Sequence, residues 1–187
     1  MRLSKTLPED IEEIIASGDL GAVARAVEGC QISAYLRRSA YEPRLMHFPA
    51  SQEITAFLLE RGEDINSRDR YEQTPVHWRV MNRRVDQIPY LVSRGADINA
   101  RDWDDRTPLF DAVRMLEASD VERMISWGAN ARVVAKSRFH GKVTLTEHTL
   151  GEEVFLDAPR ALGVIRVLLA HRARTGKRER ESLRSMD

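Results

Sequence analysis

The sequence predicts an all-α fold in which short helical hairpins repeat along the chain, and three observations support this prediction. Gly29, Gly62, Gly95 and Gly128 lie 33 residues apart, and a fixed period of this length is typical of repeat proteins. Each glycine follows an apolar segment with helical spacing, where a residue that readily adopts a left-handed conformation can end a helix. Two Thr-Pro dipeptides, also one period apart, mark helix starts.

The helices of one repeat are placed by these start and stop signals. In each Thr-Pro pair, at 74–75 and 107–108, the threonine can cap a helix while the proline occupies the first turn, where its missing N–H costs nothing. The segment 74–95 has room for two short antiparallel helices with a turn near 82–85. We expect residues 96–106 to form an extended loop that leads to the next pair.

Composition and charge limit the class of protein. The chain has 187 residues, of which 42% are apolar, which fits one globular domain with a sizeable core. Lys plus Arg and Asp plus Glu number 29 each, so no overall charge attracts nucleic acid or an anionic membrane. The only cysteine is Cys30, and no apolar segment approaches the length of a membrane span. These features predict a cytoplasmic protein.

With these patterns in view, the sequence resembles the ankyrin-repeat family, whose unit is a β-turn finger plus two helices with a T-P-L-H-x-A signature. The matching segments are TPVH at 74–77, TPLF at 107–110, GEDIN at 62–66, GADIN at 95–99 and GAN at 128–130. The resemblance implies an ankyrin-repeat solenoid of about five repeats. It also implies a non-catalytic module that binds another protein.

The sequence departs from the family pattern at several positions. Phe110 replaces the signature histidine, Arg79 replaces its alanine, and Pro89 lies inside the second helix of its repeat. Pro89 is compatible with a helix only if that helix starts late, so that the proline falls in the first turn. His47 stands three residues out of register with the signature histidine, and Pro49 should shorten the helix at this position.

The repeats are expected within a single domain at 1–173, followed by a charged C-terminal tail at 174–187. The approximate repeat bounds are 6–33, 34–66, 67–99, 100–132 and 133–173. The last repeat contains an insertion at 133–157, because its closing helix, Ala161 to His171, ends eleven residues later than the period predicts.

The shape of the insertion is open to two interpretations. In the first, Thr144 and Glu147 cap a short helix that ends at Leu150. In the second, KVTLT at 142–146 and EEVFL at 152–156 pair as a β-hairpin, since valine, threonine and phenylalanine favour pleated surfaces.

The resemblance places the partner-binding residues on the finger tips and the concave face, where side chains are free of packing between repeats. Tryptophan, tyrosine and arginine dominate protein interfaces. For Tyr71 and Trp103 we expect contact with the partner rather than packing, whereas for Trp78 and Trp127 we expect packing rather than contact. The candidate partner-binding residues are Arg70, Tyr71, Gln73, Met81, Asn82, Trp103, Asp104, Arg106, Arg114 and Trp127.

No motif in the sequence predicts catalysis, a metal site or a cofactor. The five histidines lack HExxH or Cys/His spacing, and Cys30 falls in a small-residue slot that packing explains. We therefore expect an adaptor or an inhibitor, such as a bacterial immunity protein that neutralises a toxin, monomeric when free. The alternative is an enzyme or small-ligand binder that uses His140, Glu147, His148 and Glu152 of the insertion.

Overall fold

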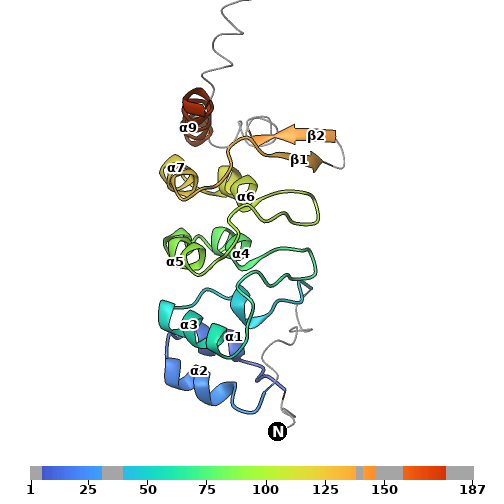
Figure 1. Cartoon of the computed structure of the whole chain (residues 1–187), viewed down its shortest axis with the longest axis vertical. Helices are drawn as coiled ribbons and strands as arrows, with labels where there is room; N and C mark the ends of the chain where they lie inside the picture. Colours follow the sequence, from blue (N-terminus) through green and yellow to red (C-terminus); the bar gives the residue numbers. More distant parts are fainter. Residues whose placement is uncertain (1–5, 31–39, 138–140, 146–157, 176–187) are drawn as a thin grey trace, which may run out of the picture. The chain divides into compact units, whose positions relative to one another are not determined.

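The computed structural model describes residues 6–30, 40–137, 141–145 and 158–175. The chain divides into two compact units, residues 1–103 and 104–187. The described residues are mostly helical, with one two-stranded sheet (Figure 1). Among them, no helix has the length and apolar character needed to cross a membrane.

The first unit begins with a short helical hairpin, α1 (Ile11–Ala16) and α2 (Leu20–Ala26). Gly18 turns the chain between them with a positive φ of 76°, a conformation that glycine adopts without a steric penalty. The Asp19 side chain then caps α2 by accepting the N–H of Ala22. The buried apolar residues of this hairpin are Ile11, Ile15, Val23 and Val27.

The second repeat starts with a single 3₁₀ turn instead of a full helix. This turn, η1 (Leu45–His47), is followed by α3 (Gln52–Glu60). Pro49 lies directly between them and has no N–H to continue a helix, so the expected shortening is confirmed. The Ser51 hydroxyl caps α3 by accepting the N–H of Ile54 at 3.3 Å.

The third repeat contains the two antiparallel helices expected between 74 and 95, α4 (Pro75–Met81) and α5 (Ile88–Ser93). They are joined through the 3₁₀ turn η2 (Val85–Gln87), and α5 starts late enough to hold Pro89 in its first turn. Figure 1 shows α4 and α5 side by side, with the loop at 61–74 extending beyond α4 on the side away from α5.

Side-chain bonds connect successive loops of the first unit. The Asn66 amide donates to the carbonyl of Gly95 at 3.0 Å, and its oxygen accepts the N–H of Asp97 at 2.8 Å. The asparagine of the repeated D-I-N pattern therefore ties the loop after α3 to the loop after α5.

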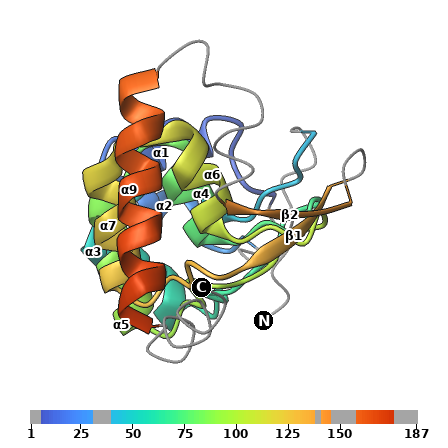
Figure 2. The same ribbon diagram turned by 90° about the horizontal axis from the view of Figure 1, so that it is seen from above.

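The second unit contains the hairpin α6 (Pro108–Met115) and α7 (Ala118–Ser126), a two-stranded sheet and the long helix α9 (Ala158–Thr175). Strands β1 (Val134–Ser137) and β2 (Gly141–Thr144) pair antiparallel. Both views place this sheet on the side of α6 away from α7 and α9 (Figures 1 and 2).

The sheet shows the structure of part of the insertion. Residues 142–144 are extended, as the hairpin interpretation required, and they pair with 134–136. Neither interpretation considered this closer partner, which a short connection brings alongside. Residues 152–156 lie outside the described part of the chain. The expected helix that ends at Leu150 falls mostly on residues that lie outside the described part of the chain.

Helix α9 is longer than the expected span of Ala161 to His171. At its start Pro159 lies in the first turn, where a helix tolerates proline. At its end the helix includes Arg174 and Thr175, which the sequence analysis assigned to the tail. Gly163 faces α7 closely, since a Cβ on it would lie 3.2 Å from the Cβ of Ala118.

Candidate functional site

Three aromatic side chains on the loops of the first unit form a continuous strip, here called the aromatic strip: Tyr41, Tyr71 and Trp103. The Tyr41 and Tyr71 rings meet edge to face with centroids 5.2 Å apart, and the Tyr71 and Trp103 rings stack at 6.2 Å. Tyr41 is 45% exposed and Trp103 is 61% exposed. The strip is therefore a large apolar surface that water still reaches.

Backbone hydrogen bonds hold the three loops in line. The N–H of Arg70 donates to the carbonyl of Tyr41 at 2.8 Å, and the N–H of Trp103 donates to the carbonyl of Tyr71 at 3.0 Å. Because each bond links neighbouring loops directly at the strip, the spacing of the rings is set by the main chain.

The carboxylate of Asp69 shapes the middle loop. One oxygen accepts the N–H groups of Tyr71 at 2.8 Å and Gln73 at 2.9 Å, while the other accepts the indole N–H of Trp78 at 2.9 Å. Burial raises the pKa of Asp69, although these three donors favour its charged form. Asp69 thus fixes the loop that carries Tyr71 and attaches it to α4.

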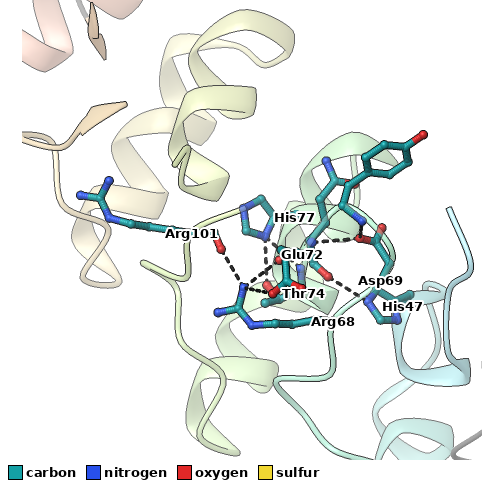
Figure 3. A network of polar contacts seen from close by, with 9 residues as sticks. His47, Arg68, Asp69, Glu72, Thr74, His77 and Arg101 are labelled. Carbon is teal, nitrogen blue, oxygen red and sulfur yellow. Dashed lines mark hydrogen bonds and ion pairs between the residues drawn. The ribbon is translucent and has the colours of Figure 1, made fainter. Parts of the chain in front are cut away.

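Arg68 braces the same loop against the next one (Figure 3). Its Nη1 donates to the carbonyl of Glu72 at 2.9 Å and to the carbonyl of Arg101 at 2.7 Å. The exposed ion pair with the Glu72 carboxylate, at 3.4 Å, adds little. Arg68 and Arg101 lie 33 residues apart, which is one period of the sequence. The bond therefore joins equivalent positions of two successive loops.

Two histidines tie the starts of their repeats to the loops (Figure 3). The Nδ1 atom of His77 accepts the N–H of Thr74 at 3.1 Å. His47 does the same for the N–H of Arg44 at 3.1 Å, and its Nε2 donates to the carbonyl of Gln73 at 3.1 Å. His47 therefore fills the signature role despite its shifted register.

The neutral form of His47 suits this position. Burial lowers its pKa to about 4, and the positive charges of Arg79 and Arg44 act in the same direction. A second proton would also place an N–H on Nδ1, opposite the N–H of Arg44 that this atom accepts.

Trp78 joins the aromatic strip to the interior of the unit. Its indole lies edge-on to the rings of Tyr41, His47 and Phe48, with centroids 5.5 to 5.9 Å apart. The side chain is half-buried, and its N–H is held by Asp69. This arrangement matches the packing role that the sequence allowed for Trp78.

The candidate partner-binding residues of the first unit differ in how much of each side chain is exposed to solvent. Arg70 is exposed next to the strip, whereas Gln73 is buried at 8% exposure. Gln73 offers its carbonyl to His47, so its expected place on an open contact surface is wrong. Met81 is half-buried at the end of α4, and Asn82 is exposed, donating its amide to the carbonyl of Trp78 at 2.8 Å.

The second unit holds the other four candidates. Asp104 and Arg106 form an ion pair at 3.1 Å, with about a third of each side chain exposed. Arg114 is exposed near the end of α6. Trp127 is half-buried next to the C-terminal end of α7, with the Arg123 guanidinium 5.0 Å from its ring centroid.

Tyr41 is a strip residue that the sequence analysis missed. It stands three residues before Arg44, as Tyr71 stands three residues before Thr74. Setting His47 in register with His77 would have aligned the two tyrosines. The three-residue shift between repeats concealed this signal.

No group of three or more histidine, cysteine, aspartate or glutamate side chains that could hold a metal ion occurs in the described part of the chain. Cys30 is buried. The insertion residues of the alternative hypothesis, His140, Glu147, His148 and Glu152, lie outside the described residues.

Comparison with known proteins agrees with the repeat geometry. A family model described as ankyrin repeats, in three copies, matches residues 45–135. No curated protein matches the chain significantly. Ankyrin repeats are generally protein–protein interaction modules, and the family is typically non-catalytic. The mostly helical fold, the signature histidines and this match show that the chain is an ankyrin-repeat protein.

Proposed function

We propose that the chain binds a protein partner through the aromatic strip, with Arg70 as an adjoining charged contact. The observation that carries this proposal is the exposure of Tyr41 and Trp103, at 45% and 61%, on loops that hydrogen bonds hold in place. Large aromatic side chains are frequent hot spots. Rings that are already ordered lose less conformational freedom on binding.

The partner should offer an apolar patch with acidic groups at its edge. The strip supplies apolar area, and the exposed Arg70 beside it supplies positive charge. The charge pair between Arg70 and an acidic group of the partner would be exposed, and salt screens exposed charge pairs. We therefore expect binding to weaken moderately, and not to vanish, as the salt concentration rises.

An adaptor and an inhibitor, including a bacterial immunity protein, share this binding step. They differ in what binding does to the partner: an inhibitor covers its active site, whereas an adaptor leaves that site open. We propose that the free protein is monomeric and cytoplasmic. Light scattering at micromolar concentration, showing one chain of 21.4 kDa, would support the monomer, and a stable dimer would contradict it.

Affinity capture followed by calorimetry with the purified partner tests the proposal. The double variant Tyr71→Ala, Trp103→Ala should lose the captured protein and raise its Kd at least about 30-fold, the effect of a hot spot worth about 2 kcal/mol. Leu162→Ala is the matched control, because Leu162 is 56% exposed on α9. An unchanged Kd for the folded double variant would place the binding surface elsewhere.

A further inference from the structure

Arg79 is a buried cation at the position where the family signature has alanine. Its side chain is 1% exposed. Its Nη1 donates to the carbonyl of His47 at 2.7 Å and to that of Met46 at 3.4 Å. The guanidinium therefore closes the end of η1.

These two carbonyls do not neutralise the charge of Arg79. Among the described residues no carboxylate forms an ion pair with it, and its buried Nε has no hydrogen-bond partner. Burial, assisted by Arg84 and opposed by Asp86, lowers the pKa of Arg79 to about 10, so the group remains charged at neutral pH. A buried charge is costly unless it is paired.

Arg79 lines a cavity of about 250 Å³ within the first unit. The walls include Ser51, which caps α3, and Thr55 of α3, together with Arg84, Asp86 and Gln87 from the turn between α4 and α5. Arg84 and Asp86 are exposed and lie 3.7 Å apart, so they mark the side that opens to solvent. Two arginines and one aspartate give these walls a net charge of +1.

We propose that this cavity binds a carboxylate group. A planar carboxylate can accept hydrogen bonds from a guanidinium in a matching geometry, and its single negative charge balances the net charge of the walls. The buried Oε1 of Gln87, which has no hydrogen-bond partner among the described residues, can accept an N–H or O–H next to the carboxylate.

The cavity is separate from the aromatic strip. Its walls come from the segment just before α3, from α3, α4 and α5, and from the α4–α5 turn, whereas the strip lies on the loops before η1 and α4 and after α5. The two sites share no residue. A failure of carboxylate binding in this cavity would therefore not count against the protein partner proposed for the strip, and a failure of partner binding would not count against the cavity.

NMR observation of the Arg79 Nε–H tests the proposal on the full chain. The probes are succinate, a free dicarboxylate that can place one of its two carboxylates in the cavity, and the blocked peptide acetyl-Gly-Glu-Gly-amide, which carries one carboxylate on a polypeptide. Saturable shifts of this signal, half complete at millimolar concentration, support the site. Saturation by succinate alone assigns it to free acids, and saturation by the peptide assigns it to acidic side chains.

Arg79→Ala should abolish the succinate response, measured by the backbone amides of Ser51 and Gln87. Arg84→Gln should weaken succinate binding about fivefold, and it keeps the test valid if the first variant does not fold. The matched control is Arg83→Gln, because Arg83 is exposed but does not line the cavity. No saturation by either probe, tighter binding of inorganic phosphate, or equal effects of the Arg84 and Arg83 variants would overturn the proposal.

Discussion

Trp78 and Trp103 lie in the same aromatic cluster but have different surroundings. Trp78 is half-buried, contacts three rings edge-on and donates its indole N–H to Asp69. Trp103 stacks on Tyr71 and leaves 61% of its surface exposed. The inner tryptophan is packed within the repeat, whereas the outer one is the ring that we propose contacts a partner.

The two residues also show how position within a repeat determines this difference. Trp78 lies on α4, directly after the signature histidine. Trp103 lies on a loop whose backbone is already bonded to its neighbour. A loop fixed by main-chain bonds can carry an exposed ring without needing that ring for stability.

The largest effect should come from removing the inner ring. Trp78→Ala deletes a half-buried ring with three aromatic neighbours and leaves the Asp69 carboxylate without one of its donors. We expect a loss of about 3 kcal/mol in the free energy of unfolding. Urea denaturation followed by circular dichroism measures it, and a loss below about 1 kcal/mol would show that Trp78 does not hold the cluster together.

The pH dependence of stability depends on Glu63, which is 5% exposed. Burial raises its pKa to about 7, despite the nearby Arg44. Because the folded state holds this proton more tightly, stability falls as the pH rises from 4.5 to about 7. Glu63→Gln should therefore stabilise the protein by about 3 kcal/mol at pH 8 and leave it unchanged at pH 4. Equal stability of variant and wild type at pH 8 would contradict this.

His47 should produce the opposite slope. Its pKa is lowered to about 4, so the unfolded state binds the proton more tightly and stability is lost as the pH falls from 6.5 towards 4. In the wild type, the opposite pH dependence of Glu63 masks that of His47. In the Glu63→Gln variant, of these two pH dependences only that of His47 remains. Adding His47→Ala should cost about 2 kcal/mol at pH 7 through the lost hydrogen bonds, and it should flatten the remaining slope. A slope that persists would assign the titration to another group.

The smallest effect on stability should come from the outer ring. Trp103→Ala removes a side chain that is mostly solvated already, and we expect a loss below about 1 kcal/mol. A thermal unfolding midpoint close to that of the wild type would agree with this. A loss comparable to that of Trp78→Ala would show that both rings serve the fold.

Regular features of the chain could be predicted because each depends on local chemistry. The glycine period gave the helix ends, with Gly95 and Gly128 both at positive φ, and Pro89 falls in the first turn of α5 as expected. Tyr71 and Trp103 were placed on fingers by the resemblance alone. Their assignment as contacts remains a prediction.

Features that depend on alignment between repeats were harder to predict. Tyr41 was missed because its repeat is shifted by three residues, and Gln73 was placed on the surface because the sequence does not show that this position faces inward. The pairing of 134–137 with 141–144 was not among the interpretations of the insertion, because neither composition nor spacing indicates which segment pairs with strand β2.

The most direct test of the central claim follows the three tryptophans by ¹⁹F NMR after incorporation of 5-fluorotryptophan. Single Trp→Phe variants assign the signals, and the purified partner is then added to saturation. The Trp103 signal should shift and lose its sensitivity to exchange of H₂O for D₂O, while the Trp78 signal changes little. A Trp103 signal that remains solvent-sensitive in the saturated complex would contradict binding through the aromatic strip.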